Sequence, residues 1–357
     1  MPVHPHIVVF AGDGIGPEVV HEARRVLEVV VPHLTYSDLL LGGCAIDTHG
    51  VPLRDEDVET ARDADAVLLG AVGGPKWDNP ASSIRPEQGL LKIRKELGLF
   101  ANLRPVKASE MLADASPLKN HIIAGTDIVV VRELTGGLYF GQPSKQWDEG
   151  GERVAVDTMF YQEHEIERVA RIAFEFARQR RSKVTSIDKA NVLATSRLWR
   201  QVVTEVASDY PDIVLDHMLV DSASMKLIQS PTMFDVIVTE NMFGDILTDE
   251  ASVLGGSLGL LASASVGAER EGRNRLGLFE PIHGTAPDIA GKEIANPAGM
   301  MLSAALMLRM AFGLEAEATA IEAAVDATLN AGIRTGDLGG LASTVEFSDA
   351  VLERIDR

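Results

Sequence analysis

Short apolar runs alternate with longer amphipathic segments along most of the chain, and this alternation restricts the folds that it can adopt. A short apolar run that ends in glycine or polar residues is typical of a buried strand. Strands that alternate with helical patterns predict an α/β fold with a largely parallel sheet. The predicted strands cover residues 6–11, 66–72, 127–131, 183–187 and 236–239, and the predicted helices cover 17–31, 163–181, 196–208, 297–312 and 315–331.

Three of the predicted strands end in charged or amide side chains. The pairs Arg-Glu at 132–133, Asp-Lys at 188–189 and Glu-Asn at 240–241 each follow an apolar run directly. In open α/β sheets, ligands bind beyond the carboxyl ends of the strands. These pairs therefore predict one polar cleft.

The length of the chain, 357 residues, exceeds what one hydrophobic core usually holds, so two domains are predicted. No segment is long and polar enough to be a simple linker. We therefore expect a discontinuous division, in which the chain crosses into a second domain and returns to the first.

The composition excludes several classes of partner. The formal net charge of −19 argues against nucleic acid and against an anionic membrane surface. Cys44 is the only cysteine, so neither a disulfide framework nor a thiolate metal cluster is expected. The sequence shows no signal peptide and no membrane-spanning apolar run, and a soluble cytoplasmic protein is expected.

Residues 241–250 read N-M-F-G-D-I-L-T-D-E and form a candidate metal site. Gly244 is expected to mark the turn into a helix, which would place Asp245 and Asp249 one helical turn apart on one face. Carboxylates at this spacing can share Mg²⁺ or Mn²⁺. Asp221, after a short predicted strand, offers a third carboxylate. The alternative is that the two helical aspartates only complement the helix macrodipole.

The segment G-D-G-I-G-P-E at 12–18 follows the first strand but does not match the Rossmann fingerprint, because the sixth-position glycine is missing. No acidic residue ends a second strand at the expected distance either. We therefore expect no standard Rossmann site, and interpret the glycines as a tight turn at the edge of the cleft.

Residues 279–297 are rich in glycine and proline and are predicted to form a loop. His283, Gly284 and Thr285 would bring main-chain groups close to a ligand, and Asp288 would accept a hydrogen bond from a ribose hydroxyl. An ordered loop with a purely structural role is the alternative.

Three arginines and two further side chains are candidates for binding and proton transfer. Arg94, Arg104 and Arg132 suit carboxylates, since a guanidinium binds a carboxylate in a bidentate manner. For Arg94 the alternative is an ordinary surface position. Tyr139 could donate a proton or could simply pack, and a partly desolvated Lys189 could accept one.

The order of these segments resembles the β-decarboxylating dehydrogenases of the isocitrate/isopropylmalate dehydrogenase family, and most closely their isopropylmalate branch. The resemblance extends from about residue 6 to 313 and is weak beyond about 335. The motifs that carry it are G-D-G-I-G-P-E, G-G-P-K-W-D, L-L-K-I-R-K with A-N-L-R-P, R-E-L-T-G-G-L-Y-F-G, D-K-A-N-V-L, F-G-D-I-L-T-D-E-A-S and E-P-I-H-G-T-A-P-D-I-A-G-K-E-I-A-N-P.

The resemblance implies a two-domain α/β fold with a mixed sheet flanked by helices, which is not a standard Rossmann fold. It implies a discontinuous cofactor-binding domain, 1–102 plus 256–357, and a domain for substrate, metal and dimerisation, 103–255. The implied reaction is the NAD-dependent oxidative decarboxylation of (2R,3S)-3-isopropylmalate to 2-oxo-4-methylpentanoate and CO₂ in leucine biosynthesis. Metal-assisted hydride transfer would be followed by decarboxylation and protonation of the enol.

The resemblance also assigns roles to individual residues. Lys189 would accept the hydroxyl proton and Tyr139 would protonate the enol. In the implied homodimer, Lys189 and Asp221 would complete the site of the neighbouring subunit. The substrate carboxylates would be bound by Arg94, Arg104 and Arg132, and Mg²⁺ or Mn²⁺ by Asp221, Asp245 and Asp249.

Substrate and cofactor preference are implied by two segments. Leu90 and Leu91 would contact the branched alkyl group, and Glu87 would repel the third carboxylate of isocitrate. Asp288 would repel a 2′-phosphate, which favours NAD over NADP. The implied cofactor-binding residues are Ile15, Gly74, Glu87, Glu280, His283, Gly284, Thr285, Ala286, Asp288, Ile289 and Asn296.

Two alternatives remain open from the sequence. One is a sister enzyme that acts on D-malate, tartrate, isocitrate or homoisocitrate. The other is an inactive ligand-binding protein on the same scaffold, although simple binding would require neither Lys189 nor Tyr139 as a proton carrier.

Overall fold

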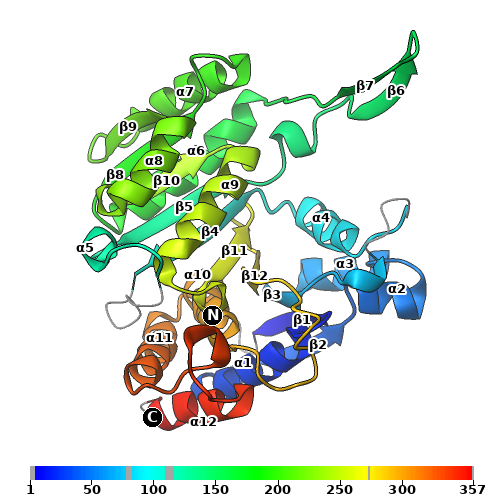
Figure 1. Cartoon of the computed structure of the whole chain (residues 1–357), viewed down its shortest axis with the longest axis vertical. Coiled ribbons are helices and arrows are strands. Elements are labelled where there is room, and N and C mark those ends of the chain that lie inside the picture. Colours follow the sequence, from blue (N-terminus) through cyan, green and yellow to red (C-terminus); the bar gives the residue numbers. More distant parts are fainter. Residues whose placement is uncertain (1–4, 78–82, 109–115, 272–273, 356–357) are drawn as a thin grey trace. The chain divides into compact units, whose positions relative to one another are not determined.

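The computed structural model describes residues 5–77, 83–108, 116–271 and 274–355. The chain divides into two compact units (Figure 1). Unit 1 comprises Met1–Leu99 and Gly255–Arg357, and unit 2 comprises Phe100–Leu254. The chain therefore enters unit 2 once and then returns to unit 1. These limits lie at 99/100 and 254/255, compared with the sequence-based limits at 102/103 and 255/256.

Unit 1 has five neighbouring strands in the order β2-β1-β3-β12-β11. Its pairs are parallel except for β11 with β12. Helices α1 and α10 pack on its strands. Its elements are β1 His6–Gly12, α1 Gly16–Val30, β2 Thr35–Leu39, α2 Gly43–His49, α3 Asp55–Asp63, β3 Ala66–Ala71, α4 Glu87–Glu96, β11 Ala262–Val266, β12 Gly277–Pro281, α10 Ala298–Phe312, α11 Glu315–Asn330 and α12 Thr344–Arg354, with 3₁₀ turns η1 Pro75–Trp77, η6 Leu258–Leu260 and η7 Gly336–Leu338.

Unit 2 has strands in the order β4-β5-β10-β8-β9, of which only β4 with β5 is antiparallel. Its elements are β4 Ala101–Lys107, α5 Asn120–Ile123, β5 Asp127–Glu133, β6 Lys145–Glu149, β7 Glu152–Val156, α6 Glu163–Arg178, β8 Lys183–Asp188, α7 Ala194–Ala207, β9 Val214–Leu219, α8 Val220–Gln229, β10 Val236–Thr239 and α9 Asn241–Ser252, with 3₁₀ turns η3 Gly137–Tyr139, η4 Pro231–Met233 and η5 Val253–Gly255, the last of which ends in unit 1.

Helices cover both faces of the unit 2 sheet. Ile128 and Val130 of β5 share a core cluster with residues of α8 and α9, and α6 packs on β5, β10 and β8. Successive strand residues point to opposite faces, and the alternate residues Val129 and Val131 are also buried. The near-continuous apolar runs predicted from the sequence are explained by burial on both faces.

A hairpin of β6 and β7 forms a separate two-stranded sheet that extends away from the rest of unit 2 (Figure 1). Most of its residues are exposed. A two-stranded hairpin is marginally stable alone in water, and three or more strands are usually needed for independent stability.

The predicted elements are present, with ends that differ by a few residues, and two expectations were wrong. Gly244 lies inside α9, which begins at Asn241, so it does not mark the turn into the helix. The segment 279–297 is not a loop throughout, because Phe279, Glu280 and Pro281 belong to β12. Among the described residues, no helix is long and apolar enough to cross a lipid bilayer.

Candidate active site

Arg132 is a buried cation near the end of β5 and contacts helix α9. Its side chain is only 7% exposed. Nε and Nη2 donate to Asn241 Oδ1 at 3.2 and 2.8 Å, and Nη1 donates to Asp245 Oδ1. Gly244 makes this approach possible, because a Cβ at that position would lie 2.5 Å from Arg132 Cγ. The structure thus brings a predicted substrate arginine against a predicted metal carboxylate.

Tyr139 lies on the other side of the same carboxylate. Its hydroxyl donates to Asp245 Oδ2 at 2.8 Å, while the ring is half exposed. Desolvation of the hydroxyl, together with the nearby Asp245 carboxylate, raises the pKa of Tyr139 above its usual range. The phenol therefore keeps its proton at neutral pH, as a proton donor must.

Arg104 on β4 makes the corresponding contact with Asp249. Its Nη1 donates to Asp249 Oδ1 at 3.1 Å and to Thr248 at 2.8 Å, and its Nε donates to Asn102 at 3.0 Å. The Asp249 side chain is 69% exposed. Each predicted metal aspartate of α9 is therefore paired with one of the predicted substrate arginines, and both carboxylates lie on one helix as the spacing predicts.

Lys189 and Asp221 form a second group, at the end of β8 and in the first turn of α8. Lys189 Nζ lies 2.6 Å from Asp221 Oδ1. This hydrogen bond holds the pKa of the Asp221 carboxyl below its usual range. Within the part of the chain that the structure describes, no three His, Cys, Asp or Glu side chains gather closely enough to hold a metal ion.

In unit 1, the turn after β1 lies against the segment 283–289. Ile15 N donates to Thr285 O at 2.9 Å, and a Cβ at Gly14 would lie 2.1 Å from that carbonyl oxygen. The G-D-G-I-G-P-E motif therefore forms a tight turn, with glycines at positive φ, and this turn supports the segment 283–289. Ala286 also adopts positive φ, at 37°.

Helix α4 lies next to β12 and to the turn after β3. Arg94 Nη2 donates to Glu280 Oε1 at 2.6 Å, so Arg94 is not a simple surface residue. A Cβ at Gly73, next to Gly74, would lie 3.0 Å from Glu87 Oε1. Leu91 is 44% exposed, whereas Leu90 packs partly against the core of unit 1.

Two residues of the predicted cofactor set have notable hydrogen bonding. His283 Nδ1 lies 2.9 Å from Gly284 O, and its Nε2 is buried without a partner in the described structure. Burial lowers the pKa of His283, so the ring is neutral at neutral pH. Nε2 can thus accept a hydrogen bond from a bound group. Asn296 instead donates to Asp337 at 2.9 Å, while Asp288 and Gly284 are exposed and Ile289 is half-buried.

Asp13 supports this region and was not singled out from the sequence. It is 6% exposed and accepts three main-chain hydrogen bonds, from Gly43, Cys44 and Gly73. It therefore joins the turns after β1 and β3 to the start of α2. Its position inside the G-D-G-I-G-P-E motif was the available signal. Asp78, the last residue of the G-G-P-K-W-D motif, lies outside the described residues.

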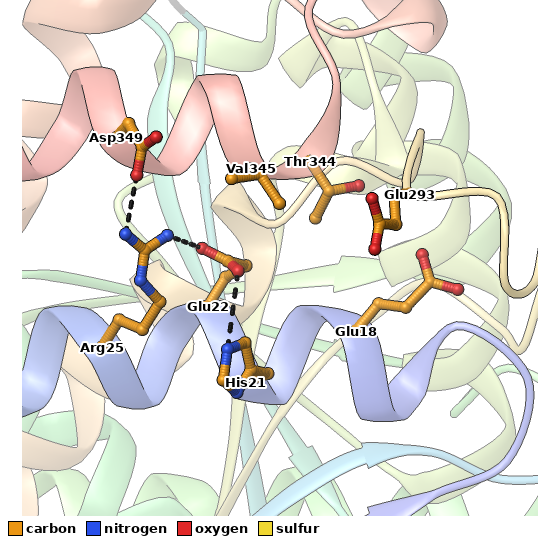
Figure 2. A pocket seen from close by; sticks show the side chains of 8 residues that line it. All are labelled: Glu18, His21, Glu22, Arg25, Glu293, Thr344, Val345 and Asp349. Atoms are coloured by element: carbon orange, nitrogen blue, oxygen red, sulfur yellow. Dashed lines mark hydrogen bonds and ion pairs between the residues drawn. The ribbon is translucent and has the colours of Figure 1, made fainter.

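A cavity of about 320 Å³ in unit 1 does not contain any of the predicted site residues (Figure 2). It lies along α1, α12 and residue Glu293, and four of its eight lining residues are acidic. Arg25 forms ion pairs with Glu22 and Asp349 there, and its positive charge partly balances the acidic residues of the cavity. We interpret it as an internally compensated surface recess.

Comparisons with known proteins show which family the chain is similar to. The family model described as isocitrate/isopropylmalate dehydrogenase matches residues 6–351. The 3-isopropylmalate dehydrogenase of Anaeromyxobacter dehalogenans is 58% identical over 98% of this chain and 99% of its own length. That of Bacillus subtilis is 57% identical over 98% of this chain and 95% of its own length.

Solved structures show the same fold. An isocitrate dehydrogenase from Methylococcus capsulatus superposes with a TM-score of 0.87 at 34% identity, over 99% of this chain and all of that one. A β-decarboxylating dehydrogenase from Thermococcus kodakarensis has a TM-score of 0.81 at 38% identity, over 98% of this chain and 96% of that one. The chain therefore belongs to the isocitrate/isopropylmalate dehydrogenase family.

Proposed function

We propose that this protein catalyses the NAD-dependent oxidative decarboxylation of 3-isopropylmalate to 2-oxo-4-methylpentanoate and CO₂, a step of leucine biosynthesis. The observation that carries the proposal is the network in unit 2, where Arg132 and Tyr139 both contact the Asp245 carboxylate. A carboxylate-binding cation, a proton donor and a metal-type ligand then lie at one place. The relatives named 3-isopropylmalate dehydrogenase share 55–59% identity, compared with 34% for the isocitrate dehydrogenase structure.

The substrate preference is supported by helix α4. Leu91 is exposed and can contact an alkyl group, whereas an exposed Glu87 at the start of α4 would repel a third carboxylate. Leu90 is half-buried, so we expect Leu91 to make the larger contact with the substrate. Isopropylmalate has a branched alkyl group at the position where isocitrate has a carboxymethyl group, and the two leucines favour the former.

The residues of the chain suggest a division of the chemical work. Arg94, Arg104 and Arg132 bind the substrate carboxylates. Lys189 accepts the proton of the substrate hydroxyl, directly or through water, while the hydroxyl-bearing carbon loses a hydride. The carbon–carboxylate bond of the resulting keto acid then breaks and releases CO₂. Tyr139 gives its proton to the enol carbon, which completes the product.

The proposal includes two bound groups that fit the residues present. For the metal, Asp221, Asp245 and Asp249 supply oxygen ligands of the kind that Mg²⁺ and Mn²⁺ prefer. For the cofactor, His283 Nε2 is an acceptor without a hydrogen-bond partner in the described structure. When bound, NAD accepts the hydride, and the metal ion stabilises negative charge on the substrate oxygens. The remaining cofactor contacts stay as predicted, through Ile15, Gly74, Glu87, Glu280, Gly284, Thr285, Ala286, Asp288, Ile289 and Asn296.

We further propose a homodimer in which Lys189 and Asp221 complete the neighbouring site. The supporting observation is an apolar surface on α8 and α9, which pack side by side. Met225 and Ile228 of α8 are 55% and 45% exposed, and Ile246 of α9 is 59% exposed. Large apolar side chains that are exposed on adjacent helices are typical of a protein–protein interface. The projecting β6–β7 hairpin would gain partners in the same assembly.

The decisive experiment measures NADH formation from 3-isopropylmalate with NAD and Mg²⁺. We expect activity that is lost when EDTA removes the metal and that falls strongly when NADP replaces NAD. D-malate and isocitrate serve as comparison substrates, and both should give a lower kcat/KM. A preference for D-malate would replace the proposed substrate with that of a sister enzyme. The absence of NADH with all of these acids would favour the ligand-binding alternative.

A further inference from the structure

Two buried carboxylates and one buried phenol form a cluster next to the candidate site of unit 2. Glu133 at the end of β5, Glu240 after β10 and Tyr161 before α6 are 0%, 4% and 5% exposed. The Tyr161 hydroxyl lies 3.2 Å from Glu133 Oε2 and 3.4 Å from Glu240 Oε2. Burial raises the pKa of all three groups. None of the three is needed for the proposed proton transfers.

The cluster fixes the start of helix α9. The first N–H groups of a helix lack partners within the helix, and here those of the first three helical residues each have an acceptor. Asn241 N donates to the Tyr161 hydroxyl at 3.0 Å. Met242 N and Phe243 N donate to the Glu240 carboxylate at 3.1 and 2.7 Å. The regular helical bonds then begin with Gly244 N, which donates to the Glu240 carbonyl oxygen at 2.9 Å.

The cluster also fixes the segment that carries Tyr139. Glu133 accepts hydrogen bonds from Thr135 N and Gly136 N at 2.7 and 2.8 Å. The Tyr161 side chain lies so close to residues 136–137 that a Cβ at Gly136 would be 2.7 Å from a ring carbon, and a Cβ at Gly137 would be 2.5 Å from the hydroxyl oxygen. Asn241 Nδ2 donates to Gly136 O at 3.1 Å and so links this segment to α9.

We propose that Tyr161, held by Glu133 and Glu240, is a positioning residue that sets the place of Tyr139 relative to Arg132 and Asp245. This inference rests on the proposed function of that site. The route is short, because Asn241 receives the Tyr161 contact through its main chain and binds Arg132 through its side chain. Loss of the hydroxyl leaves the buried Asn241 N–H without an acceptor, which favours a shift of the first turn of α9.

The test replaces Tyr161 with Phe and keeps the ring that packs on Trp199 at 5.8 Å. Tyr210→Phe is the matched control, since Tyr210 is a 7% exposed tyrosine of unit 2 that stacks on Phe174 at 5.0 Å. A displacement of about 1 Å in a catalytic group can lower the rate about 100-fold. We expect Tyr161→Phe to lower kcat/KM for 3-isopropylmalate at least about tenfold, with KM for NAD unchanged. Tyr210→Phe should change neither constant.

Two measurements do not depend on turnover. Hydrogen exchange followed by mass spectrometry should show faster exchange in peptides covering the first turn of α9 in Tyr161→Phe, and no change in Tyr210→Phe. Titration of Mn²⁺ into the metal-free protein, followed by electron paramagnetic resonance, should show weaker binding in Tyr161→Phe alone. A role limited to stability would instead lower Tm and leave the exchange pattern of α9, Mn²⁺ binding and kcat/KM unchanged.

The inference is overturned if folded Tyr161→Phe retains wild-type kcat/KM and wild-type exchange in α9. If Tyr161→Phe does not fold, Glu133→Gln provides the same test, because it keeps the shape of the side chain and weakens its hydrogen bonds to residues 135–136. A wild-type level of kcat/KM in folded Glu133→Gln then overturns the inference. Failure of the proposed function is distinguished by wild-type protein that forms no NADH from 3-isopropylmalate.

Discussion

Arg132 and Gly244 illustrate how a residue without a side chain can determine where a buried charge lies. The Arg132 stem occupies the space beside Gly244, with Cγ, Cβ and Cδ at 2.5, 2.8 and 3.0 Å from the position that a Cβ would take. Glycine in a helix costs about 1 kcal/mol relative to alanine. The chain accepts this cost where the guanidinium must reach both Asn241 and Asp245.

We predict that Gly244→Ala raises KM for 3-isopropylmalate at least about tenfold, because Arg132 must move away from its partners. Stability should change little, since the better helix propensity of alanine opposes an overpacking cost of about 1–3 kcal/mol. Steady-state kinetics and urea unfolding provide the two measurements. Gly336→Ala is the control, because a Cβ there meets nothing within 4 Å. An unchanged KM in Gly244→Ala would show that Arg132 tolerates displacement.

The sequence singled out charged residues that the structure brings into contact, but not the groups that hold them. Arg132 was singled out because a charge that directly follows an apolar run is unusual, and Asp245 and Asp249 because their spacing puts both on one helical face; the structure places Asp245 against Arg132. Tyr161 was not singled out, because the neighbouring sequence does not distinguish a tyrosine whose hydroxyl joins several groups from one that only packs in the core. Its proposed role depends on Glu133 at the end of β5 and Glu240 just after β10, which become neighbours only through the pairing of these two strands.

At the scale of elements, helix α9 has an unusual N-terminus, because a buried glutamate serves as its cap. Glu240 accepts from the amides of Met242 and Phe243, where Ser, Thr, Asp or Asn would be the common choice. Burial raises the pKa of the Glu240 carboxyl above its ordinary value of 4.5, although the two amides oppose the shift. The folded protein therefore holds the Glu240 proton more tightly than the unfolded chain does.

The sign of this shift predicts how stability depends on pH. A raised folded-state pKa contributes stability that is complete below pH 4.5 and is lost as the pH rises through the folded value. Glu240→Gln lacks this loss, so its free energy of unfolding should improve relative to wild type as the pH rises from 4.5 to 7.5. Urea unfolding of both proteins across this range measures the difference. A difference that is constant with pH would show that burial does not destabilise the ionised Glu240.

The predicted ends of helices and strands lie close to the observed ends where glycine, proline or a capping residue marks them in the sequence. The start of α9 was misplaced, since Gly244 looked like a turn and the cap at Glu240 does not belong to the usual set. The start of the segment at 279 was also misplaced, since β12 must pair with β3 and β11 before its extended conformation is explained. Pairing between distant segments cannot be read from a local pattern.

At the scale of the whole molecule, the proposed homodimer makes a prediction about mixed subunits. Tyr139→Phe and Lys189→Ala each remove one proton carrier and should each be inactive as pure proteins. If Lys189 serves the neighbouring site, a mixed dimer of the two variants contains one intact site out of two. Random mixing makes half of the dimers mixed, so about one quarter of wild-type activity should return. The measurement is NADH formation after the two variants are co-expressed.

The control for subunit mixing pairs Tyr139→Phe with Arg132→Ala. Both residues contact Asp245 within one chain, so no arrangement of these subunits restores an intact site. Activity in that mixture would show that activity returns by some route other than the pairing of whole subunits. Inactivity in the first mixture, despite mixed dimers in native mass spectra, would place Lys189 in the site of its own chain.

The discontinuity of unit 1 also has a consequence for the order in which the protein forms during synthesis. Strand β3 pairs with β12, yet all of unit 2 is translated between them. Unit 2 is continuous in sequence and can fold as soon as it leaves the ribosome, whereas β3 lacks one of its two neighbouring strands until β12 has been translated. All residues of β3 are buried in the folded protein. Until β12 is made, the open edge of β3 is a site where chaperones can bind.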